Sequence, residues 1–155
     1  MTCKFCTFTL DHFLFGVAIN EVQEVLRHQA MTRIPLAPPE IGGLINLRGQ
    51  LITAIDLRLL FDLPPREDGS PSMNVVLHTD DGAVSLLVDE INDVMEVDER
   101  FFEETPATVH GLDRELIRGI YKLKDRLLLI LRTDTILSGE HGEVVASCGS
   151  QPAKK

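Results

Sequence analysis

The chain has 155 residues, of which 44% are hydrophobic and 25% charged, enough for one globular domain with its own core. Its formal net charge of −9 argues against a surface that binds nucleic-acid phosphates. The longest aliphatic run is Leu127–Leu131, far short of the roughly 20 residues that span a membrane. The N-terminus also lacks the features of a signal peptide, so we expect a cytoplasmic protein with no membrane insertion.

Alternating apolar residues predict an all-β fold with short helices. Residues 6–10 and 13–19 alternate on either side of a turn at residues 11–12, which is typical of a β-hairpin. Next, residues 20–21 are predicted to cap a short helical turn that includes Val22 and Val25–Leu26. A further strand is expected over residues 28–33, before a proline.

A second hairpin is predicted from residues 44–47 and 51–55, joined by Arg48-Gly49-Gln50. Gly49 suits a position with a positive φ. Asp56 then follows the hairpin and is expected to N-cap a short helix over residues 57–61.

The second half of the chain repeats this pattern. Strands are expected over residues 73–79, 83–88, 91–97, 116–123 and 127–132, with short turns capped by Asp98 and Asp134. Because each half ends with a short helix after its last hairpin, we expect two small β-barrels. The proline-rich stretch 62–72 is the predicted boundary between them, and residues 139–155 are expected to form a disordered tail.

The search for chemical motifs finds no catalytic, metal or cofactor site. Cys3 and Cys6 form a C-x-x-C, but it lies inside a predicted strand, so ordinary strand cysteines are favoured over metal or redox use. The histidines lack metal-binding spacing, and neither a nucleotide-binding loop nor a nucleophile elbow occurs.

The acidic residues are concentrated in the middle of the chain. Residues 62–104 carry thirteen acids and two bases. This segment is either a recognition face for a basic partner or, as we favour, a solvated surface. A rival hypothesis is a small β-barrel enzyme or ligand-binding domain with an acidic pocket near residues 80–104.

One stretch suggests an interface. Arg48 stands beside Gly49 at the predicted hairpin tip, between apolar strands, and a fixed guanidinium next to apolar surface is typical of a binding hot spot. The run IGGLINLRGQLITAIDLR over residues 41–58 resembles the signature of the CheW-like family of bacterial chemotaxis coupling proteins. The phrases VQEV and TRIP upstream, and LLVD and LLLIL downstream, match it as well, so the resemblance extends from Phe5 to Leu137.

The resemblance implies a fold and a function. The fold would be two intertwined SH3-like, five-stranded β-barrel subdomains within residues 1–138. The function would be that of a non-enzymatic adaptor, without cofactors, that links chemoreceptor cytoplasmic tips to the regulatory domain of the histidine kinase CheA in arrays at the inner membrane. A flagellar pathway, a pilus-motility pathway and second-messenger control all remain open, and the kinase-binding surface is not assigned.

The resemblance also indicates where a receptor would bind. Matching motif positions are Val22, Glu24, Gly43, Arg48 and Gly49, and sequence spacing adds Ile34, Leu44 and Asn46. The apolar members would bury side chains of a receptor helix, and Arg48 would donate charge-assisted hydrogen bonds to the receptor. Glu24 would orient either Arg48 or a polar receptor group, and the two glycines would allow close backbone approach.

Overall fold

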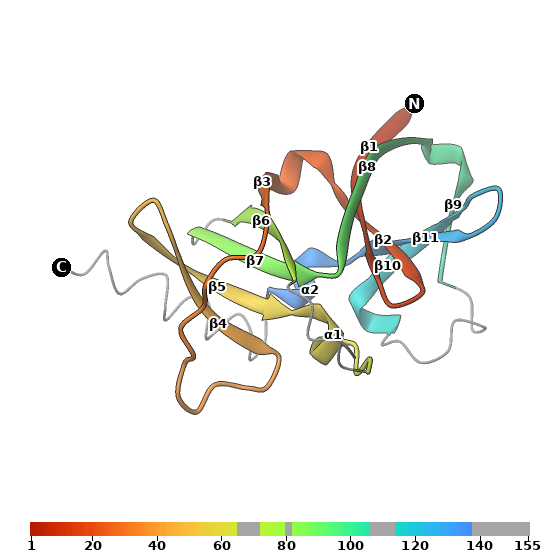
Figure 1. The fold of residues 1–155 in the computed structure, drawn as a ribbon. Coiled ribbons are helices and arrows are strands. Elements are labelled where there is room, and N and C mark those ends of the chain that lie inside the picture. Colours follow the sequence, from red (N-terminus) through yellow and green to blue (C-terminus); the bar gives the residue numbers. More distant parts are fainter. Residues whose placement is uncertain (65–71, 80–81, 106–113, 138–155) are drawn as a thin grey trace.

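The computed structural model describes residues 1–64, 72–79, 82–105 and 114–137, and it consists mainly of two β-sheets (Figure 1). Sheet A has the strand order β8-β1-β2-β11-β10-β9 and sheet B the order β3-β6-β7-β5-β4. Sheet A contains β1 (Thr2–Leu10), β2 (Phe13–Ala18), β8 (Glu90–Asp98), β9 (Phe102–Glu103), β10 (Ile117–Lys122) and β11 (Leu127–Leu131). Sheet B contains β3 (Val22–Leu26), β4 (Ile41–Leu47), β5 (Gln50–Asp56), β6 (Met73–Thr79) and β7 (Gly82–Val88).

The helices are all short. Two are α-helices, α1 (Leu57–Leu60) and α2 (Thr133–Ile136), and three are 3₁₀ turns, η1 (Ile19–Glu21), η2 (Glu99–Phe101) and η3 (Arg114–Leu116). The predicted all-β class with two β-sheet subdomains is therefore confirmed, although sheet A gains a sixth strand from the two-residue β9. The predicted tail, residues 139–155, lies outside the described residues.

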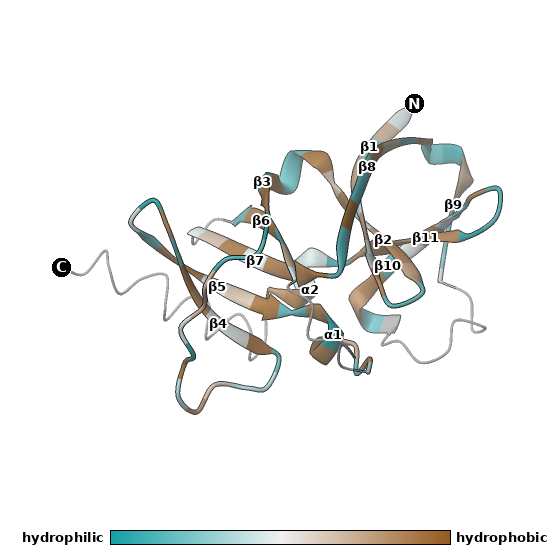
Figure 2. Cartoon of the chain, in the orientation of Figure 1, coloured by the Kyte–Doolittle hydropathy of each residue, from teal (hydrophilic) through white to brown (hydrophobic). Residues whose placement is uncertain are grey.

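The two sheets share one apolar core. Phe8 and Phe15 from sheet A pack in the same buried cluster as Val75 and Leu86 from sheet B. Side chains on the opposite face of each sheet form smaller clusters, centred on Leu128 in sheet A and on Ile52, Ile45 and Val76 in sheet B. Apolar residues accordingly follow the strands, while the turns are polar (Figure 2). Burial of this shared core is the main force that keeps the sheets together.

The chain does not divide into two sequential halves. It passes from sheet A to sheet B through η1 and returns between β7 and β8. The strands on either side of residues 62–72, β5 and β6, both belong to sheet B, which differs from the boundary predicted there. The parallel pairs β2–β11 and β5–β7 account for the difference, because they join strands that are distant in sequence.

The turn at Asp11 and the helix cap at Asp56, which were predicted from neighbouring residues in the sequence, are confirmed. Asp11 has a φ of +57° in the first hairpin turn, and Asp56 N-caps α1 by accepting hydrogen bonds from the backbone N–H groups of Arg58 and Leu59. The predicted helical turn at residues 22–26 is wrong: this segment is strand β3, paired with β6. Likewise, residues 28–33 form no strand beyond a single bridge between Thr32 and Leu44. Asp134 lies inside α2, which begins at Thr133 and has no side-chain cap.

Leu36 lies in the connection between β3 and β4 with a φ of +63° and a fully exposed side chain. A leucine at this φ is strained, whereas asparagine adopts it readily. We expect Leu36→Asn to raise the free energy of unfolding by about 1 kcal/mol, measured by urea denaturation. Leu36→Ala, which keeps the strained Cβ, should change stability little. Equal effects from the two variants would contradict this explanation.

No helix in the described ranges is long and apolar enough to cross a membrane. Within the same residues, no three His, Cys, Asp or Glu side chains gather closely enough to hold a metal ion.

Candidate functional site

The site is built on the tip of the β4–β5 hairpin. Leu47 pairs with Gln50, so the loop has only two residues, Arg48 and Gly49, with φ values of +54° and +85°. Two positive φ values define a type I′ turn, whose twist matches that of the flanking strands. The Asn46 side-chain oxygen accepts a hydrogen bond of 2.9 Å from the Gly49 N–H, and this bond stabilises the turn. The tip projects from the side of the molecule away from sheet A (Figure 1).

Arg48 is held in place by Glu24. Its two terminal nitrogens donate hydrogen bonds of 2.6 and 2.7 Å to the two carboxylate oxygens of Glu24 on β3. The Arg48 side chain is 69% exposed, whereas that of Glu24 is 20% exposed. Glu24 was predicted to orient either Arg48 or a polar group of the receptor, and in the structure its carboxylate binds and orients Arg48. The pair fixes the direction of the guanidinium while leaving much of it open to solvent.

The ion pair also has an electrostatic signature. The hydrogen bonds from Arg48 lower the pKa of Glu24 and raise that of Arg48. Because the folded-state pKa of Glu24 is lowered, the stabilisation from this pair is present above the ordinary glutamate pKa. It is lost as the pH falls through the lowered value.

We therefore expect the Glu24 side-chain carbonyl, followed by ¹³C NMR, to titrate below the ordinary glutamate range in the wild type. In Arg48→Met the titration midpoint should move up towards that range, because the main lowering group is gone. An unchanged midpoint in Arg48→Met would show that the two side chains do not pair in solution.

The same contacts link the two edges of sheet B. β3 and β4 are its edge strands, and the Glu24–Arg48 pair joins β3 to the tip of the β4–β5 hairpin. Farther along β4, Thr32 and Leu44 exchange two backbone hydrogen bonds of 2.7 and 2.8 Å. The Glu24–Arg48 pair thus closes sheet B towards a barrel, and the Thr32–Leu44 bridge holds the β3–β4 connection against β4.

Gly43 is required by the chain's own backbone. A Cβ at Gly43 would lie 2.6 Å from the Thr32 carbonyl oxygen and 3.2 Å from the Met31 Cβ, and its φ is +149°. The close backbone approach predicted at Gly43 is therefore made by residues 31–32 of the same chain. By contrast, a Cβ at Gly49 would meet nothing within 4 Å, so only its φ of +85° favours glycine there.

The predicted site residues form three groups. Gly43 and Leu44 lie on β4 beside Thr32. The hairpin group, with Arg48, Gly49 and Asn46, is joined to Glu24 by the contacts above. Val22 and Ile34 are partly buried and pack against the core shared by the sheets. The structure thus places Val22 and Ile34 on the body of the molecule rather than at the tip.

Three exposed apolar side chains were not predicted as site residues. Ile19 on η1, Val25 on β3 and Val94 on β8 are 39%, 45% and 52% exposed. η1 and β3 lie at the crossing from sheet A to sheet B, and β8 is the edge strand of sheet A that follows the return crossing (Figure 1). Val94 pairs with Cys6, which pairs with Val17 of the shared core, so it extends the core's apolar face to the surface. Alternation in the sequence marked Val94 as a strand residue but could not indicate its exposure.

The two cysteines of the C-x-x-C lie on β1 and both are free. The Cys3 thiol donates a hydrogen bond of 3.0 Å to Glu99, which raises the pKa of Cys3, and burial raises the pKa of Cys6. Raised pKa values keep both thiols protonated and weakly reactive, as in ordinary strand cysteines.

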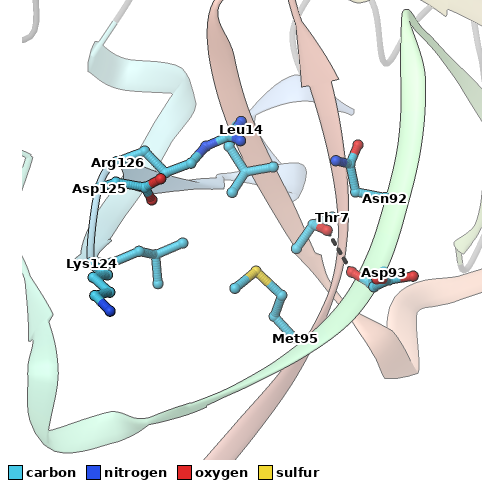
Figure 3. A pocket seen from close by; sticks show the side chains of 9 residues that line it. Thr7, Leu14, Asn92, Asp93, Met95, Lys124, Asp125 and Arg126 are labelled. Atoms are coloured by element: carbon cyan, nitrogen blue, oxygen red, sulfur yellow. Dashed lines mark hydrogen bonds between the residues drawn. The ribbon is translucent and has the colours of Figure 1, made fainter.

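The rival hypothesis required an acidic pocket near residues 80–104. A hollow of about 440 Å³ does lie there, between β8 and the β10–β11 turn (Figure 3). Its acids Asp93 and Asp125 are matched by Lys124 and Arg126, and Leu14, Met95 and Leu123 supply an apolar wall. This hollow is of mixed charge rather than acidic, and it includes none of the predicted site residues.

Two β-sheets around a shared core, with an exposed and oriented ion pair at a hairpin tip, define a small all-β interaction module. The CheW-like domain family matches the chain over residues 4–141, and the chain belongs to this family. It is similar to the chemotaxis protein CheW of Bacillus subtilis, at 31% identity over 90% of each chain. With CheW of Klebsiella aerogenes it shares 30% identity over 92% of this chain and 86% of the other.

The fold is also similar to a solved structure of the family. The crystal structure of the scaffolding protein TtCheW from Thermoanaerobacter tengcongensis matches with a TM-score of 0.80 and 30% identity, covering 91% of each chain. Members of this family are non-catalytic scaffolds, and the chain is accordingly a chemotaxis coupling adaptor rather than an enzyme.

Proposed function

We propose that the chain couples the helical cytoplasmic tip of a chemoreceptor to a CheA-type histidine kinase, in the cytoplasm, within receptor arrays at the inner membrane. One surface holds the receptor and another holds the kinase regulatory domain. The adaptor has no turnover of its own: changes in the receptor reach the kinase through a scaffold of fixed geometry. Each contact is modest, and assembly into an array strengthens the whole by multivalency.

The observation that carries this proposal is the exposed, pre-oriented guanidinium of Arg48. Glu24 accepts one hydrogen bond from each terminal nitrogen of Arg48, and the remaining N–H groups of this exposed side chain can meet a carboxylate or a backbone carbonyl of a receptor helix. Because the side chain is already held in one direction, binding costs little additional conformational entropy.

Apolar contacts complete the proposed receptor surface. Val22, Ile34 and Leu44 are partly exposed, and Ile19, Val25 and Val94 add apolar area along the edge where the sheets join. A receptor helix would place its apolar stripe on these side chains, in the manner of helix-in-groove recognition, while Arg48 fixes its register. Gly43 supports the surface indirectly, by letting residues 31–32 pack against β4.

A co-sedimentation assay tests the proposal. The full chain, a soluble receptor-tip fragment assembled on a template and the CheA kinase from the same cell are mixed, and the pelleted kinase is measured. We expect the chain to raise the amount of kinase that pellets with the receptor by at least about tenfold, by the effective-concentration argument. If the chain pellets with neither component, the proposed function is wrong.

A further inference from the structure

A second ion pair lies at the point where the chain returns from sheet B to sheet A. Arg58 on α1 donates hydrogen bonds of 2.8 and 2.7 Å to the two carboxylate oxygens of Asp89, the residue between β7 and β8. Both side chains are mostly buried, 14% and 17% exposed, in contrast to the open Arg48. A bidentate pair in a partly buried position is strongly directional and resists screening by salt.

The hydrogen-bond network around Asp89 connects both sheets. Its carboxylate accepts a bond of 2.9 Å from the Asp11 N–H in the β1–β2 turn, and its own N–H donates to the Thr9 carbonyl at 3.1 Å. Arg58 also donates to the carbonyl of Pro64, beyond α1. One pair therefore ties the helix that follows sheet B to the first hairpin of sheet A (Figure 1).

The shared apolar core and this pair perform different tasks. Apolar burial holds the sheets in contact, but it is non-directional, so it defines the angle between them less sharply than oriented hydrogen bonds do. A fork of two parallel hydrogen bonds permits only a narrow range of angles. At the other crossing, η1 is held by single hydrogen bonds rather than by a fork: the Asn20 carbonyl oxygen accepts from the His78 ring at 2.9 Å, and the Thr133 hydroxyl donates to the Glu21 carboxylate at 2.5 Å.

We propose that Arg58 and Asp89 are positioning residues that set the angle between the two sheets and thereby the spacing of the receptor surface. Val22 follows the first crossing directly, and β8, with Val94, begins at Glu90 directly after Asp89. A rotation of the sheets at these crossings changes the separation of Val22 and Val94. This inference rests on the proposed function for its consequence in binding, but its geometric part is independent of any partner.

The test separates orientation from stability. The double variant Arg58→Met, Asp89→Asn replaces the ion pair by neutral groups of similar size and keeps an oxygen for the Asp11 N–H. Neutral replacement of a buried ion pair is often tolerated in stability. Arg58→Lys is a second variant, which keeps the charge but loses the fork. The matched control is Arg100→Met, Asp98→Asn, because Arg100 is exposed, Asp98 is partly exposed, and both residues lie at the start of η2.

Residual dipolar couplings of the full-length chain give the angle directly. In the wild type and in the control, one alignment tensor should fit the amides of both sheets. In the double variant and in Arg58→Lys, each sheet should still fit its own tensor, while the two tensors differ. A single tensor for both sheets in Arg58→Lys and in the double variant would overturn the proposal.

Binding of a receptor-tip fragment, followed by isothermal titration, gives the consequence. We expect the double variant and Arg58→Lys to bind about tenfold more weakly than the wild type and the control. If the tensors differ and the wild type binds no receptor tip, the proposed function fails and the positioning role stands. If the tensors differ but all four proteins bind equally, the angle does not govern the receptor surface.

Discussion

Arg48→Glu is expected to weaken binding of a receptor-tip fragment by more than about thirtyfold, the loss typical of a hot-spot residue. The substitution removes an oriented guanidinium and places a second carboxylate beside Glu24. The fold should remain intact, because the Arg48 side chain is 69% exposed. Isothermal titration measures the affinity, and circular dichroism checks the fold.

Two further variants make this prediction specific. Arg126→Glu introduces the same charge change on the exposed β10–β11 turn and should bind as the wild type does. The exchange Arg48→Glu with Glu24→Arg allows the ion pair to re-form but moves the guanidinium to β3. It should stay weak if Arg48 contacts the receptor, whereas recovery of binding would show that Arg48 acts only by closing sheet B.

Gly43→Ala is expected to lower the free energy of unfolding by about 2 kcal/mol. The new Cβ would lie 2.6 Å from the Thr32 carbonyl oxygen, so the backbone bridge between Thr32 and Leu44 has to shift. Urea denaturation measures the change.

Gly49→Ala measures the cost of a positive φ without the steric clash that is expected in Gly43→Ala. Gly49 also has a positive φ, but a Cβ there would meet nothing within 4 Å, so the cost should be only about 1 kcal/mol. If instead Gly43→Ala left stability unchanged and abolished receptor binding, Gly43 would be a direct contact and our account of it would be wrong.

The hairpins and the Asp56 cap were predictable because their signals are local. Alternating residues set the strands, and Asp11 and Gly49 supply turns with a positive φ. Strand β3 was not predictable, because its pairing with β6 joins Val22 to Leu77, far along the chain. A short apolar segment such as 22–26 suits a helical turn or a strand, and the partner strand decides between them.

The residues of the proposed site come from the sequence, whereas their arrangement is known only from the structure. Arg48 was identified by its position beside Gly49, but its own positive φ follows from the two-residue loop. The sequence left two roles open for Glu24, because it does not indicate that β3 lies beside the hairpin tip. The role of Gly43 depends on Thr32, which pairs with β4 only after the long β3–β4 connection folds back. The roles of Glu24 and Gly43 therefore depend on tertiary contacts, whereas the φ of Arg48 depends on the local hairpin loop.

Chemical-shift mapping of an unlabelled receptor-tip fragment on the ¹⁵N-labelled full chain tests the central claim most directly. We predict the largest perturbations at the backbone amides of Val22, Glu24, Arg48 and Val94, and at the Arg48 side-chain Nε–H. Perturbations confined to the hollow beside the β10–β11 turn, with the Arg48 signals unmoved, would contradict it.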